Sequence, residues 1–201
     1  MKYGINLIVL IFTLNLCSFT ISDPTPRKQK IVIDAAFLND ENATEEYETE
    51  KEITEAIARK VKFLNSDKSI EIIIIRDKGE ALTAVEKVKM INDLKPDLVI
   101  SLHLNSDRDT TIRGIDALVG TENSNNEESK EIAEAIFQST PKSYSKGEVK
   151  EINYFTLNNL NCPAILLELG YTSNSQDREY LNSQLGQQRI AETIVKTIKM
   201  K

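Results

Sequence analysis

The chain has 201 residues, of which 40% are hydrophobic and 28% charged, a balance typical of one globular domain. Its 31 acidic and 25 basic residues give a net charge of −6, which argues against a nucleic-acid-binding protein. His103 is the only histidine, and this excludes every zinc centre built on two or three histidines.

An apolar run near the N-terminus predicts an export signal. Residues 5–19 are largely hydrophobic, but the run is too short and too interrupted for a transmembrane helix. We therefore expect a signal peptide over residues 1–22, a polar lead-in over 23–29 and the folded domain over 30–201, without a membrane span in the mature chain. Cys17 leaves open a lipoprotein-type signal with a lipid anchor, and an uncleaved apolar N-terminus is the remaining alternative.

The rest of the chain alternates β-branched runs with amphipathic segments. Apolar runs predict buried strands over residues 30–36, 71–76, 97–102, 115–119 and 164–169. Apolar residues at helical spacing predict helices over residues 50–65, 82–94, 125–139, 177–182 and 184–199. We expect an extended segment over 152–157 and loops over 39–49, 104–113 and 140–149.

Strands separated by helices of this length imply right-handed β-α-β units. The expected fold is therefore a single α/β domain, with a mainly parallel twisted sheet and helices on both faces. Ligands of such sheets bind beyond the carboxyl ends of the strands. Residues that follow the predicted strands are thus the place to look for a site.

Motifs occupy several of these positions. The first strand reads IVIDA, a helix begins at Glu50-Lys51, residues 101–105 read SLHLN, and residues 163–174 read PAILLELGYTSN. In order and spacing they resemble the motifs VIDAGHGG, EK, SIHAN and PAVLVELGFLSN of the zinc-dependent N-acetylmuramoyl-L-alanine amidases, which are peptidoglycan hydrolases. The resemblance spans about residues 30–200 and implies the amidase fold, which is like that of the zinc exopeptidases.

The resemblance also implies roles for the matching residues. Glu50 and His103 match two zinc ligands, and Glu168 matches the carboxylate that acts as general base and then as general acid. Asn105 is a candidate substrate-binding residue. The substrate would be peptidoglycan, cut between N-acetylmuramic acid and the L-alanine of its peptide stem. Such a protein is expected in the bacterial cell envelope, either periplasmic or secreted.

The residues themselves leave plainer alternatives for Glu168 and for the turn after it. Glu168 lies inside an apolar run, so its carboxylate is expected to be at least partly buried and to need a partner, and a structural ion pair is the alternative to catalysis. Tyr171, Ser173 and Asn174 are expected to shape the turn that follows. Lys87 stands where the family often has arginine, and the exchange would matter at a bidentate binding site. We expect Lys87 on a solvated helix face instead, where the exchange has no consequence.

The first motif departs from the family pattern. Phe37 occupies the position of the first ligand histidine, and the neighbouring glycines are absent. Asp40 or Glu41 could supply the third ligand, giving a set that suits zinc or a harder cation such as Mn²⁺. Two functions follow: an amidase with a degenerate metal site, or an inactive amidase-fold protein that binds peptidoglycan or regulates a true amidase. An unrelated α/β binding protein is a third alternative.

Overall fold

The computed structural model describes residues 27–35, 45–76 and 82–200. The strands are β1 Gln29–Ala35, β2 Ile70–Arg76, β3 Leu98–Asn105, β4 Ile115–Gly120, β5 Lys146–Ile152 and β6 Ala164–Tyr171. The helices are α1 Glu45–Leu64, α2 Ala84–Asp93, α3 Asn126–Ser139, α4 Phe155–Asn158, α5 Ser175–Asn182 and α6 Gln184–Ile198. The predicted signal peptide and the residues Phe37, Asp40 and Glu41 lie outside the described residues.

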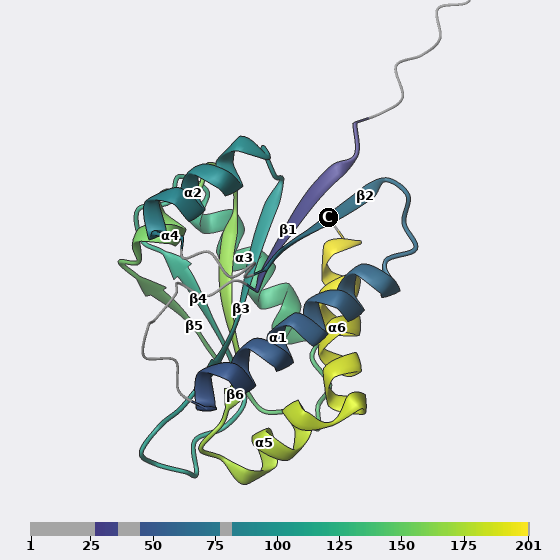
Figure 1. The fold of residues 1–201 in the computed structure, drawn as a ribbon, viewed down its shortest axis with the longest axis vertical. Coiled ribbons are helices and arrows are strands. Elements are labelled where there is room, and N and C mark those ends of the chain that lie inside the picture. The colour runs from purple at the N-terminus through teal and green to yellow at the C-terminus, as the bar shows by residue number, and fades with distance from the viewer. Residues whose placement is uncertain (1–26, 36–44, 77–81, 201) are drawn as a thin grey trace, which may run out of the picture.

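The six strands form one sheet in the order β2-β1-β3-β6-β4-β5. The strands β2, β1, β3 and β6 run parallel to one another. The remaining two strands, β4 and β5, are parallel to each other, and β4 lies antiparallel to β6. The prediction of a single α/β domain with a mainly parallel sheet is confirmed (Figure 1).

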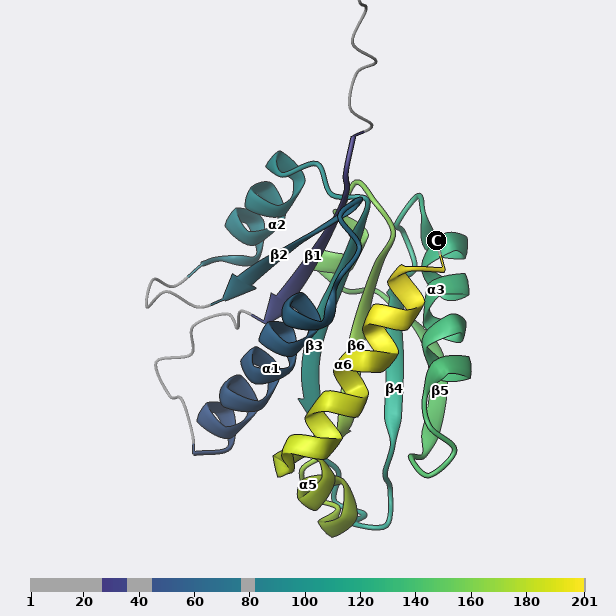
Figure 2. The same cartoon turned by 90° about the vertical axis from the view of Figure 1, so that its right-hand side faces the viewer.

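Helices cover both faces of this sheet, as expected (Figure 2). On one face, which we call the α1 face, α1, α3 and α6 bury the larger hydrophobic core against alternate strand residues such as Ile33, Ile100 and Leu167. On the other, the α2 face, Ile91 of α2 and Leu157 of α4 bury a smaller core. Among the described residues, no helix has an apolar stretch of membrane-spanning length.

The α2 face changes character along the strands. Near the amino ends of β3 and β6 it is apolar, with Val99, Ala164 and Leu166 in the smaller core. Because side chains alternate between the two faces of a sheet, His103 lies on the same face as Val99, and Glu168 lies on the same face as Leu166. Both are nearer the carboxyl ends of their strands. The sheet thus brings polar side chains together at the edge where ligands of parallel sheets bind.

Several predicted boundaries were wrong. Helix α1 begins at Glu45, within the expected loop 39–49, and β3 continues to Asn105 because this residue still pairs with Tyr171 of β6. The expected loop 140–149 contains part of β5, and the segment predicted as extended over 152–157 holds the start of α4. Strand β5 is mostly exposed and polar, so it lacks the hydrophobic alternation that reveals a strand in a sequence.

Candidate active site

Glu50 and His103 lie in direct contact, although 53 positions separate them in the sequence. The Oε1 atom of Glu50 in α1 is 3.2 Å from Nδ1 of His103 in β3. The same oxygen accepts a hydrogen bond of 2.9 Å from the backbone N–H of Leu104. The two side chains are 20% and 27% exposed, so both remain open to solvent or to a ligand. Two residues that the sequence placed in one site therefore meet at the carboxyl end of β3.

Glu168 lies on the strand next to His103 and pairs with it in register. Its Oε2 atom accepts a hydrogen bond of 2.7 Å from the side-chain amide of Asn105. The amide oxygen of Asn105 in turn accepts the backbone N–H of Ser106, and its backbone carbonyl accepts the N–H of Thr172. These contacts fix the orientation of Asn105, which was predicted to bind substrate and here holds the carboxylate of Glu168.

The environment of Glu168 favours its protonated form. Burial of the side chain and then the negative charge of Asp116 raise the pKa of Glu168 above its ordinary value. The charges of Lys150 and His103 and the Asn105 hydrogen bond oppose this shift without cancelling it. A carboxyl group with a raised pKa can both hold and release a proton nearer neutral pH, which general acid–base catalysis requires. The expectation of a partly buried Glu168 carboxylate is confirmed.

Asp116 is a polar residue of this region that the sequence analysis missed. It lies opposite Glu168 on β4 and is only 4% exposed. Its Oδ2 atom accepts hydrogen bonds from the hydroxyl of Tyr171 at 2.7 Å and from Nζ of Lys150 at 3.2 Å. Its Oδ1 atom accepts the backbone N–H of Glu148 at 2.9 Å. A lone carboxylate inside the apolar run 115–119 is the signal that could have revealed it.

Lys87 is not on a solvated helix face, so that prediction was wrong. The side chains of Lys87 and Asp34 are both buried, and Nζ lies 3.2 Å from Oδ2. Ser101 donates a further hydrogen bond of 2.8 Å to the same carboxylate oxygen. A buried charge needs such a partner, and this pair fixes α2 against β1 two residues before the degenerate part of the first motif begins at Ala36.

The turn after β6 is built as the sequence suggested for two of its three residues. Asn174 caps α5, because its side-chain oxygen accepts the backbone N–H groups of Gln176 and Asp177. The hydroxyl of Ser173 accepts the N–H of Asp107. Tyr171 instead ends β6 and belongs to the Asp116 cluster described above.

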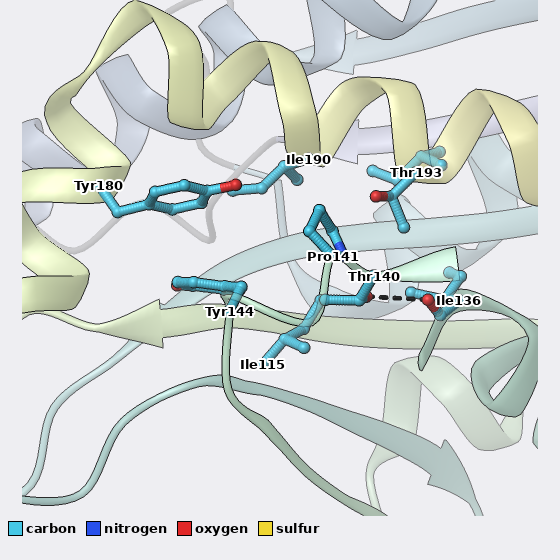
Figure 3. A pocket seen from close by; sticks show the side chains of 9 residues that line it. Ile115, Ile136, Thr140, Pro141, Tyr144, Tyr180, Ile190 and Thr193 are labelled. Atoms are coloured by element: carbon cyan, nitrogen blue, oxygen red, sulfur yellow. Dashed lines mark hydrogen bonds between the residues drawn. The ribbon is translucent and has the colours of Figure 1, made fainter. Parts of the chain in front are cut away.

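A small cavity lies away from these residues, on the α1 face (Figure 3). Its volume is about 10 Å³, the space of a single water molecule. The stacked rings of Tyr144 and Tyr180, with centroids 4.4 Å apart, close one end, and Ile190 and Thr193 of α6 line one side. The predicted site residues do not line this cavity, and it is too small for a substrate, so it is a packing feature of the core.

The described residues supply only part of a zinc centre. A carboxylate and an imidazole are ligands that zinc accepts, and Glu50 and His103 are in contact. A catalytic zinc ion usually takes three protein ligands. Phe37 occupies the sequence position of the remaining ligand, which is a histidine in the family motif. Within the ranges that the structure describes, three His, Cys, Asp or Glu residues nowhere gather to hold a metal. We therefore assign no reaction step through a metal to these residues.

Comparison with known structures identifies the fold as that of peptidoglycan amidases. The N-acetylmuramoyl-L-alanine amidase from Clostridium difficile 630 superposes with a TM-score of 0.76 at 23% identity, over 87% of this chain and 96% of that one. The catalytic domain of CwlV from Bacillus (Paenibacillus) polymyxa var. colistinus gives 0.73 at 24% identity, over 86% and 97%. Ami1 from Mycobacterium smegmatis gives 0.73 at 20% identity, over 87% and 96%.

Sequence comparison assigns the family. The profile of the family described as N-acetylmuramoyl-L-alanine amidase matches residues 31–200, and the chain therefore belongs to that family. The chain is also 28% identical over 156 residues to the uncharacterized protein YqiI of Bacillus subtilis (strain 168). The aligned segment covers 74% of this chain and 72% of that protein. The resemblance found in the motifs is thus confirmed at the level of the family.

Proposed function

We propose that this protein hydrolyses the amide between N-acetylmuramic acid and L-alanine in peptidoglycan. The observation that supports this most strongly is the meeting of Glu50, His103 and Glu168 at the carboxyl ends of neighbouring strands. The raised pKa of Glu168 suits a group that must accept and return a proton within one reaction. Membership of the amidase family supplies the substrate class.

In this proposal Glu168 acts first as general base toward the attacking water and then as general acid toward the departing amine. It takes a proton as the water oxygen bonds to the amide carbon, and it gives that proton to the stem nitrogen as the C–N bond breaks. The hydrogen bond from Asn105 orients the carboxylate of Glu168 for both transfers. Asn105 is thus a positioning residue, which is a narrower role than direct substrate binding.

We further propose that Glu50 and His103 bind a divalent cation, zinc or Mn²⁺, and that Asp40 or Glu41 supplies the third protein ligand. When bound, such a cation supplies Lewis-acid polarisation of the amide carbonyl. If the roughly 10–16 kcal/mol of a structural zinc site is divided evenly over four ligands, one ligand is worth about 3–4 kcal/mol. The substitute for a histidine ligand must therefore recover about two to three orders of magnitude in affinity.

A second candidate function rests on Phe37, since a phenylalanine cannot coordinate a metal. In this alternative the protein keeps the amidase fold but lacks activity, and it binds peptidoglycan or regulates an active amidase. The partly exposed Glu50–His103 pair and the Glu168 carboxyl would then contact peptidoglycan without cutting it.

Release of stem peptides from purified peptidoglycan separates the two candidates. The unchanged protein, Glu168→Ala and Phe37→His are compared with added zinc or Mn²⁺. Turnover by the unchanged protein that disappears in Glu168→Ala, while thermal unfolding stays the same, supports the amidase. Turnover only in Phe37→His supports the inactive alternative. Undiminished activity of Glu168→Ala contradicts the proposed mechanism.

We also propose that residues 1–22 direct export, because peptidoglycan lies outside the cytoplasmic membrane. N-terminal sequencing of the protein recovered from the cell envelope tests this proposal. A mature start at Asp23 supports cleavage by a signal peptidase. A lipid-modified N-terminus at Cys17 supports the lipoprotein alternative, and a retained Met1 contradicts both.

A further inference from the structure

A line of charged and polar side chains crosses the sheet beside the candidate active site. His103 of β3, Glu168 of β6 and Asp116 of β4 are successive partners in register, so their side chains lie on the same face. Lys150 extends the line to β5, because its Nζ atom lies 3.2 Å from Oδ2 of Asp116. The line therefore leads from the candidate metal ligands, past Glu168, to a lysine on the edge strand.

The position of Lys150 is fixed by a specific local structure. Asp116 is buried and accepts hydrogen bonds from Tyr171 and from the backbone N–H of Glu148 as well as from Lys150. Gly147 makes room for this carboxylate, since a Cβ atom at that position would lie 1.7 Å from Oδ1 of Asp116. The Asp116 carboxylate is thus held by three donors on two strands, and it holds the lysine in turn.

Lys150 nevertheless remains accessible. Its side chain is 45% exposed, whereas that of Asp116 is 6% exposed. An ammonium group carries three N–H donors, and the bond to Asp116 uses one of them. The negative charge of Asp116 is shared among three donors, so Lys150 does not neutralise it alone. A second acidic group can therefore approach the ammonium from the solvent side.

We propose that Lys150 binds a free carboxylate on the second residue of the peptide stem, beyond the amide that is cut. This inference rests on the proposed function, because it takes Glu168 as the point of cleavage. The Nζ atom of Lys150 lies beside Asp116, and β4, which carries Asp116, is one strand spacing from β6, about 5 Å. An extended peptide covers roughly 3.3–3.6 Å per residue, so two residues span this distance. Lys150 thus selects stems that carry a negative charge at this point.

Binding of two defined ligands tests the proposal. The probes are two N-acetylmuramoyl tripeptides whose second residue is joined to the third through its side-chain carboxyl group. They differ only in the α-carboxyl group of the second residue, which is free in one and amidated in the other. Their affinities are measured by calorimetry in a Glu168→Gln background, which prevents turnover during the measurement. This readout does not require that the protein be an active enzyme or that it hold a metal.

We expect Lys150→Met to weaken binding of the free-carboxyl tripeptide by about five- to tenfold, as for a charged hydrogen bond that is partly exposed to solvent. The amidated tripeptide should keep its affinity, and Lys150→Arg should retain most of the preference. Lys146→Met is the matched control on the same strand. Lys146 pairs with Ile115, whose side chain belongs to the core of the α1 face, so Lys146 lies on the opposite face.

The possible results separate this inference from the function on which it rests. Weakening confined to the free-carboxyl tripeptide supports the carboxylate site. Equal weakening of both tripeptides by Lys150→Met, or no weakening of either, overturns it and leaves the proposed function in place. Failure of the Glu168→Gln protein with Lys150 intact to bind either tripeptide overturns both. Thermal unfolding of each variant confirms that the compared proteins are folded.

Discussion

Asp116 and Glu168 face each other across antiparallel strands β4 and β6, yet the pKa values of their carboxyl groups are shifted in opposite directions. Burial disfavours ionisation of Asp116, but the N–H of Glu148, the hydroxyl of Tyr171 and Lys150 outweigh it and lower its pKa. Burial and the charge of Asp116 raise the pKa of Glu168. One carboxyl group therefore stays ionised while its neighbour can carry a proton, a division of roles that recurs in acid–base active sites.

Removal of the Asp116 charge should lower the pKa of Glu168. In Asp116→Asn the like charge that disfavours ionisation of Glu168 is gone, while burial of Glu168 remains, so its pKa should fall part of the way to the ordinary value. Titration of the Glu168 carboxyl carbon by NMR measures the shift. Asp67→Asn, which changes a carboxylate between α1 and β2, is the control and should leave Glu168 unchanged. An unaltered Glu168 titration in Asp116→Asn would contradict this coupling.

Asp116 should also make stability depend on pH. Its folded pKa lies below the ordinary value of 3.8, so its contribution is complete above that value and is lost as the pH falls through the folded pKa. Asp116→Asn should therefore cost about 1–3 kcal/mol at neutral pH, and the difference from the parent should shrink in acid. Urea unfolding in a Glu168→Gln background isolates the effect from the neighbouring carboxyl. A difference that stays constant with pH would argue against an ionised Asp116.

The sequence predicted the elements that bury apolar side chains, because their periodicity is strong. It also predicted that Glu50 and His103 belong to one site, because their motifs resemble those of the amidase family, and the two side chains are in contact. It could not predict β5, whose mostly polar, exposed residues lack the hydrophobic alternation of a strand. Lys150 was missed for the same reason, because it lies on β5. Asp116 lies on the predicted strand β4, but local sequence does not reveal that this strand pairs with β6 beside Glu168.

The burial of Lys87 was unpredictable for a different reason. A lysine in an amphipathic helix usually lies on its solvated side, and the apolar repeat suggested that Val85 and Val88 share the buried side. In the structure, α2 turns Lys87, Val88 and Ile91 inward and leaves Val85 exposed. The reason is Asp34, a buried carboxylate on a strand 53 positions earlier, and local periodicity carries no information about such a partner.

Lys87→Met should destabilise the fold by about 3–5 kcal/mol, because it removes the ammonium group that contacts the buried Asp34 carboxylate. The double variant Lys87→Met/Asp34→Asn should recover much of this loss, since it removes the buried carboxylate as well. Denaturant unfolding measures both. Lys89→Met removes a surface pair with Asp93, whose side chains are 75% and 66% exposed, and should cost at most about 1 kcal/mol. Equal effects of the two single variants would mean that the Asp34 pair is not buried in solution.

Gly147→Ala should disturb the Asp116 cluster directly. Gly147 does not have a positive φ, so alanine would ordinarily stabilise this position by about 0.4–1 kcal/mol through the unfolded chain. Here the new Cβ would lie 1.7 Å from Oδ1 of Asp116, so we expect a loss of about 1–3 kcal/mol instead.

A double-mutant cycle with Asp116→Ala tests the cause of that loss. If the clash with the carboxylate is responsible, Gly147→Ala should cost little once Asp116 has been shortened, and the two changes should be strongly non-additive in urea unfolding. Additive losses would place the strain elsewhere in β5. Because Asp116 also holds Lys150, Gly147→Ala should weaken the preference for the free-carboxyl tripeptide in parallel with its loss of stability. A variant that loses stability but keeps the full preference would show that Lys150 does not depend on Asp116 for its position.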